Sequence, residues 1–183
     1  MNTRLIFVLI ASIVLSACSI PAPKYSPSFD NVSMLKKANS TVKVDDFTGA
    51  KSALGSVSIR GTSLTSPYNK DLIHYIQMAL QSELEKAGLL SANGKRKLSA
   101  VIEENDIDTS NFSTGKGKIK ATFKVSSGDK VVYDKSVSSI LEWESSFIGA
   151  IAIPGAAESY PKLVTGLLQK LYSDPDFIKA LSE

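Results

Sequence analysis

The stretch Lys116–Val125, KGKIKATFKV, has the most regular pattern in the chain and decides the fold. Its apolar residues alternate with three lysines and a threonine: Ile119, Ala121, Phe123 and Val125. This period of two predicts a strand with one face in a core and the other in water. The tight turn Ser127–Asp129 follows, so the next strand, Lys130–Trp143, should pair with it in antiparallel fashion.

Shorter runs of alternation on the N-terminal side of this hairpin predict three more strands, at Thr41–Phe47, Ser56–Arg60 and Lys97–Asn105. Between the last two of these, apolar residues recur at spacings of three and four over Tyr68–Ala87. That spacing predicts a helix with one apolar stripe, for which Ser66 is a suitable N-cap.

The C-terminal third predicts two helices, the first with its apolar face on Leu163, Val164, Leu167, Leu168 and Leu171. Pro161 should lie in the first turn of that helix, and Asp174 should cap a short helix that begins at Pro175. The predicted order is therefore β-β-α-β-β-β-α-α. It indicates an α+β fold, with a mostly antiparallel sheet of about five strands and two main helices packed on one face.

Composition excludes several classes of protein. The 183 residues are 43% hydrophobic, which is too apolar for a disordered chain. One cysteine cannot form a disulfide framework, and 21 basic against 18 acidic residues leave no surplus for nucleic-acid binding. The length fits a single domain.

The N-terminus has the pattern of a secretory signal. Arg4 precedes the apolar run Leu5–Leu15, which is too short to span a bilayer as a helix. The next residues, Leu15-Ser16-Ala17-Cys18, resemble the lipobox of bacterial lipoproteins: an aliphatic residue, two small residues and the cysteine that is modified. The resemblance implies removal of residues 1–17, a diacylglyceryl thioether on Cys18, and acylation of the new amine by a chain such as palmitate.

The resemblance also implies a location. In lipoproteins of Gram-negative bacteria an Asp after the cysteine favours retention in the inner membrane, and here the residue is Ser19. We therefore expect the outer membrane, on its periplasmic face. Residues 18–33 hold three prolines and several small polar residues, which predicts a flexible tether. Residues 34–183 would form one periplasmic domain.

Few residues suggest chemistry. His74 is the only histidine and Asp71 lies three residues before it, but no G-x-S-x-G motif presents a nucleophile. The acidic run 103–108 lacks the glycine and glutamate positions of a calcium loop, and 115–118 lacks those of a phosphate loop. We therefore predict no catalytic residue, no metal site and no cofactor. The lysines of the 116–125 strand are expected to keep its outer face soluble, or else to touch anionic headgroups.

The uncharged segment 147–157, FIGAIAIPGAA, is unusual because Gly149, Pro154 and Gly155 disfavour a regular helix or strand. Such a segment is either core or an exposed contact surface. If it is exposed, the candidate partner-contact residues are Trp143, Phe147, Ile151 and Ile153.

The lipobox and the small α+β domain together resemble the auxiliary lipoproteins of transport and outer-membrane assembly systems. This likeness implies a non-enzymatic accessory component of an envelope complex, with a protein partner. The alternative is a module that binds a lipid or small solute between sheet and helices. The sequence indicates no oligomeric state.

Overall fold

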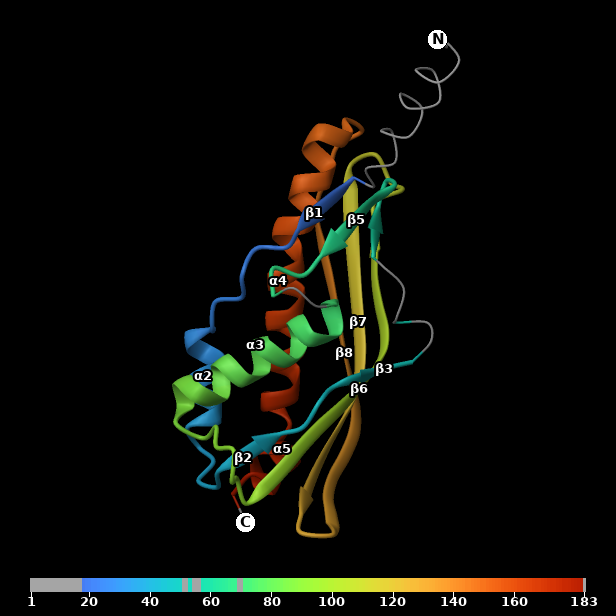
Figure 1. Ribbon diagram of the computed structural model, residues 1–183. Helices are drawn as coiled ribbons and strands as arrows, with labels where there is room; N and C mark the ends of the chain where they lie inside the picture. Colours follow the sequence, from blue (N-terminus) through green and yellow to red (C-terminus); the bar gives the residue numbers. More distant parts are fainter. Residues whose placement is uncertain (1–17, 51–52, 54–56, 69–70, 183) are drawn as a thin grey trace, which may run out of the picture.

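The structure is a computed structural model, and it describes residues 18–50, 53, 57–68 and 71–182 (Figure 1). The predicted α+β class is confirmed. Three long antiparallel strands dominate the larger sheet: β6 (Arg96–Asp108), β7 (Thr114–Ser127) and β8 (Lys130–Glu144). Two short strands, β2 (Val42–Val44) and β3 (Thr48–Gly49), pair with β6 in parallel, so the five-stranded sheet is mostly antiparallel, as predicted, with two short parallel additions.

The β7–β8 hairpin forms as predicted. The four alternating apolar residues of β7 are all buried, and Gly128 adopts a φ of 57° in the tight turn. A register shift between Val125 and Ser126 changes which face the start of β8 presents. For that reason Val131 is exposed, although its odd-numbered position predicts the same face as the buried Tyr133.

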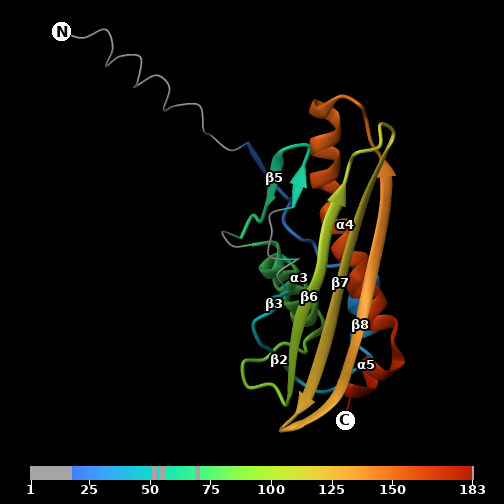
Figure 2. The same ribbon diagram turned by 90° about the vertical axis from the view of Figure 1, so that its right-hand side faces the viewer.

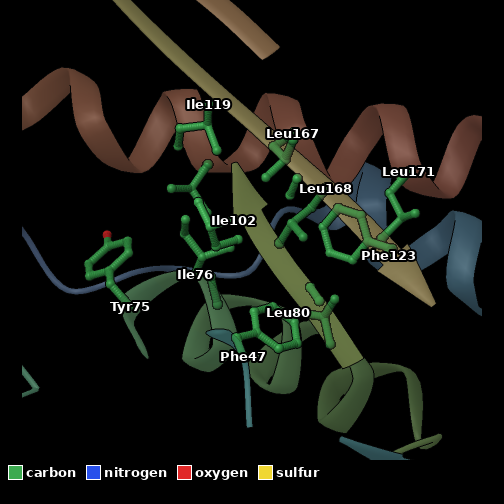
Figure 3. Close-up of a cluster of buried hydrophobic side chains, with 14 of the residues drawn as sticks. Phe47, Tyr75, Ile76, Leu80, Ile102, Ile119, Phe123, Leu167, Leu168 and Leu171 are labelled. Atoms are coloured by element: carbon green, nitrogen blue, oxygen red, sulfur yellow. The ribbon is translucent and has the colours of Figure 1, made fainter. Parts of the chain in front are cut away.

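Helices cover one face of the large sheet and leave the other open to solvent (Figure 2). The covering layer contains α2 (Phe29–Leu35), α3 (Leu72–Ala87), α4 (Gly149–Ser173) and α5 (Pro175–Ala180). Leucines of α4 meet Ile76 and Leu80 of α3 above the buried side chains of β6 and β7 (Figure 3). Asp174 caps α5 as expected, with Pro175 as its first residue.

The second main helix starts earlier and is longer than predicted. Its 25 residues include Pro154 and Pro161 inside the helix, although a proline in a helix interior removes one backbone hydrogen bond and costs about 3 kcal/mol. The uncharged segment 147–157 was expected to resist regular structure for this reason. Burial of one continuous face of α4, from Ala152 to Tyr172, offsets that cost.

The first main helix begins at Leu72, with Asp71 rather than Ser66 as its N-cap. The predicted strand around 56–60 is only β4 (Ser58–Ile59), and it pairs with an unpredicted strand, β5 (Thr62–Thr65). A third short strand, β1 (Ser19–Pro21), pairs with β5 in parallel and completes a separate three-stranded sheet.

The glycines of β7 make room for the single tryptophan. Gly115 lies opposite Trp143 in the hairpin, and a Cβ added at Gly115 would stand 2.4 Å from indole carbon Cε2. These glycines therefore serve packing, which agrees with the absence of a phosphate-loop pattern around them.

Replacing Gly115 with Ala should destabilise the fold by about 1–3 kcal/mol, because the indole ring must move from a packed position. Urea unfolding followed by Trp143 fluorescence measures this directly. Gly155→Ala is the matched control, since a Cβ there meets nothing within 4 Å and a helix interior favours Ala over Gly. An unchanged midpoint for Gly115→Ala would contradict the tight packing.

Candidate functional site

Cys18 is exposed and is the first residue that the structure describes. Its carbonyl accepts a hydrogen bond of 3.0 Å from the Ser63 N–H, and Ser19 is already the first residue of β1. The expected flexible tether over residues 18–33 is therefore wrong. Cys18 joins the three-stranded sheet with no intervening spacer.

Tyrosines hold the proline-rich segment that follows β1. The Tyr75 hydroxyl donates to the Pro23 carbonyl at 2.8 Å, and the Tyr25 N–H donates to the Tyr68 hydroxyl at 3.0 Å. An extended proline-rich chain forms no backbone hydrogen bonds of its own. Side chains around α3 supply them here, which composition alone does not reveal.

Glu83 of α3 fastens the same segment from inside. Its fully buried carboxylate accepts hydrogen bonds from the Tyr25 hydroxyl at 2.6 Å, the Ser28 N–H at 3.1 Å and the Asn31 amide at 3.1 Å. Burial raises the pKa of Glu83 above its ordinary value, although these hydrogen bonds act in the opposite direction. Asn31 also donates to the Thr165 carbonyl of α4, so the network joins three elements.

Arg60 connects the small sheet to two loops of the large one. It lies in the tight β4–β5 turn with a φ of 51°, a conformation that residues other than glycine rarely adopt. Its guanidinium donates to the Thr109 carbonyl at 3.1 and 3.3 Å and to the Phe147 carbonyl at 2.6 Å. The β6–β7 loop and the β8–α4 connection are thereby fixed beside the sheet that holds Cys18.

These two loops and the first turn of α4 carry a cluster of exposed apolar side chains, which we call the apolar tip: Phe112, Phe147, Ile148 and Ile151. Their exposed fractions are 67%, 72%, 56% and 58%. The Phe112 and Phe147 rings meet edge to face with centroids 5.2 Å apart. The tip is therefore an organised surface that water covers in the isolated chain.

The four predicted contact residues fall into two groups. Phe147 and Ile151 belong to the apolar tip, whereas Trp143 and Ile153 are partly buried and pack against the core. The sequence analysis missed Phe112 and Ile148. An aromatic residue in the otherwise polar run 108–114, DTSNFST, was the available signal for Phe112.

Charged residues singled out from the sequence have structural partners. Asp71 accepts the His74 N–H at 2.8 Å as the cap of α3, and both residues line a shallow hollow with Gln77. Within the described residues no group of three His, Cys, Asp or Glu side chains could hold a metal ion. No helix in the described ranges is long and apolar enough to cross a membrane.

The lysines of β7 form cross-strand ion pairs on the open sheet face. Lys118 and Lys120 pair with Glu104 and Glu103 of the acidic run, both at 2.6 Å. The hydrogen bond from Lys120 and a second one from Thr122 lower the pKa of Glu103. The acidic run and the lysine face are thus two halves of one paired surface.

Comparisons with known proteins establish a shared fold. Protein XCC0632 from Xanthomonas campestris, which carries the family designation DUF330, has a TM-score of 0.62 at 14% identity, covering 89% of this chain and 97% of its own. The hypothetical protein CT253 from Chlamydia trachomatis has a TM-score of 0.52 at 9% identity, covering 78% and 99%.

A minor lipoprotein from Acinetobacter baumannii aligns at a TM-score of 0.42 and 10% identity, over 74% of this chain and 91% of its own. No family model matches the chain, and no curated protein matches it. The two structures with the higher TM-scores share the fold of this chain at 14% and 9% identity.

Proposed function

We propose that the chain is a non-enzymatic lipoprotein, anchored through Cys18 on the periplasmic face of the outer membrane, where it acts as an interaction component of an envelope complex. The observation that carries this proposal is the exposed Cys18, which directly follows Leu15-Ser16-Ala17 in the sequence and lies one residue before β1. A modifying enzyme can reach the Cys18 sulfur without unfolding the domain.

The energetics of acylation support permanent anchoring. A single acyl chain gives only marginal, reversible binding to a bilayer, whereas two or more chains give a stable anchor. A diacylglyceryl thioether and an acylated amine would supply three chains at one residue. Ser19 after the cysteine supports the outer membrane as the destination.

The interaction role is supported by the open face and free edge of the large sheet. In the described part of the chain β8 pairs only with β7, which leaves a 15-residue strand with an unpaired edge. Strands of this kind are templates for pairing with another chain. Ile140 of β8 is 52% exposed and adds an apolar contact among the charged rows.

The alternative of a lipid- or solute-binding module draws no support from the interior between sheet and helices. Side chains from α3, α4, β6 and β7 meet one another there (Figure 3). The accessory role is therefore the function that the geometry supports best.

A photo-crosslinking amino acid at Ile140 should capture an envelope protein in intact cells. Phe29 is the matched control, because it is 86% exposed on α2, in the helical layer on the other side of the sheet. We expect a discrete adduct from Ile140 and none from Phe29. Adducts from Phe29 alone would contradict the assignment of the open sheet face, and no adduct from either would contradict the interaction role.

A further inference from the structure

We infer that the apolar tip inserts into the interfacial region of the same lipid leaflet that holds the acyl chains of Cys18. The inference rests on the proposed acylation of Cys18. The lipid surface would cover the apolar tip, which is exposed to water in the isolated protein.

No spacer separates the proposed anchor from the fold. Because Ser19 is already in β1, an acylated Cys18 brings the three-stranded sheet to the membrane surface itself. Ser63 binds the Cys18 carbonyl, and Arg60 is three residues before it, within about 11 Å of chain. Arg60 in turn holds the Phe147 carbonyl at 2.6 Å. The tip is thus fixed near the lipid anchor by short contacts.

The direction of the elements also favours membrane contact at the tip. Figure 1 places β1, β5 and the start of α4 at one end of the molecule, and α5 with the β7–β8 hairpin at the other. The 25 residues of α4 span about 37 Å between these ends. A body held at Cys18 therefore rests on the membrane with its tip and extends its hairpin away from it.

The side chains of the tip also suit a lipid surface. Moving two phenylalanine and two isoleucine side chains out of water lowers the free energy of the system. A phenyl ring is also suited to the boundary between lipid headgroups and acyl chains. Two backbone groups beside them already have partners, which lowers the cost of entering lipid. The Ser145 N–H donates to the Ser113 carbonyl at 2.8 Å, and the Ile148 N–H donates to the Ser146 hydroxyl at 3.1 Å.

Sequence alone left Phe147 and Ile151 as contacts for a protein partner. The geometry favours lipid, because a protein partner at the tip would have to fit between the anchored Cys18 and the bilayer. The open sheet face remains free for a protein when the tip is in the membrane.

The test places a fluorescent reporter at the tip of the full-length, cell-acylated protein. Phe147→Trp and Phe112→Trp are compared with Val131→Trp. Val131 is an exposed apolar residue beside the β7–β8 turn, at the end of β8 that is farther from the tip. Each protein is reconstituted into phosphatidylethanolamine–phosphatidylglycerol vesicles with or without brominated acyl chains. Trp143 is common to all variants and to the parent, whose emission is subtracted.

We expect a several-fold greater loss of emission for Phe147→Trp and Phe112→Trp than for Val131→Trp. Bromines near the headgroup should quench more than bromines deep in the chain, since such insertion is only about 5–10 Å deep. Equal quenching at both ends would overturn the inference. So would an unquenched Phe147→Trp whose position crosslinks to a protein in intact cells.

Mass analysis of the same preparations separates this inference from the proposed function. An acylated Cys18 with an unquenched tip overturns the lipid contact and leaves the anchor standing. An unmodified Cys18 overturns the anchor itself and, with it, the reason for membrane contact at the tip.

Discussion

Replacing Glu83 with Ala should reduce the free energy of unfolding by about 3 kcal/mol or more, because two buried side-chain donors and one partly buried backbone donor lose their acceptor at once. The Tyr25 hydroxyl, the Ser28 N–H and the Asn31 amide all bind this carboxylate. Each donor left unsatisfied in the interior costs about 1–3 kcal/mol. Urea titration monitored by circular dichroism gives the loss as a lower midpoint.

Glu83→Gln is the matched control. Its amide oxygen can occupy the position of Oε1, which accepts the three shortest hydrogen bonds, so the variant should lose much less stability than Glu83→Ala. Equal losses in the two variants would show that the side chain matters for its volume rather than for its oxygens.

The two carboxyl states of Glu83 also predict a dependence on pH. Burial raises the pKa of Glu83 in the folded state, so the folded protein binds the proton more tightly than the unfolded chain does. Stability from this group is therefore fully present below pH 4.5, the ordinary value, and is lost as pH rises through the raised folded value. The wild type should gain stability over Glu83→Gln when the solution is acidified.

Replacing Cys18 with Ala should move the protein from the membrane fraction to the soluble periplasmic fraction almost completely. Without the thiol no diacylglyceryl chain can be attached, and four exposed side chains at the tip cannot replace a stable anchor. Fractionation of cells followed by immunodetection measures the shift. The exposed position of Cys18 means that the Ala variant should still fold.

Ser19→Asp gives the complementary result for location. Its anchor is retained, and Ser19 is exposed at the edge of the small sheet, so folding should be unaffected. We expect this variant in the inner-membrane fraction, whereas the parent is expected in the outer-membrane fraction.

For the first of these two variants, a Cys18→Ala protein that stays in the membrane fraction would show that the lipid anchor is not at Cys18.

The central hairpin could be predicted from sequence because its determinants are local. A period of two through β7 and a glycine turn at Gly128 define both strands and their antiparallel pairing. The cap of α5 at Asp174 is local in the same sense. Such patterns need no information from distant parts of the chain.

The segment after Cys18 could not be predicted, because its order depends on distant partners. Tyr75 and Glu83 are more than 50 residues away in the sequence from the backbone and side chains that they hold. A composition rich in proline and serine indicates a tether when no partner is known. In the structure the same residues are ordered against α3 by these distant side chains.

The apolar tip was predicted in part. Phe147 and Ile151 stand out in an uncharged segment, but Ile153 in the same segment faces the core. The helix period that separates these faces is hidden by Pro154, which argues against a helix. The sequence around Arg60 did not indicate that it fixes the tip, because its guanidinium binds backbone carbonyls from two other loops.

The most direct test of the lipid anchor is mass spectrometry of the N-terminal peptide from protein made in its own envelope. The anchor predicts a peptide that begins at Cys18 and carries a diacylglyceryl group on sulfur and a third chain on the amine. A peptide with an unmodified Cys18 thiol, or one still joined to residues 1–17, would contradict it.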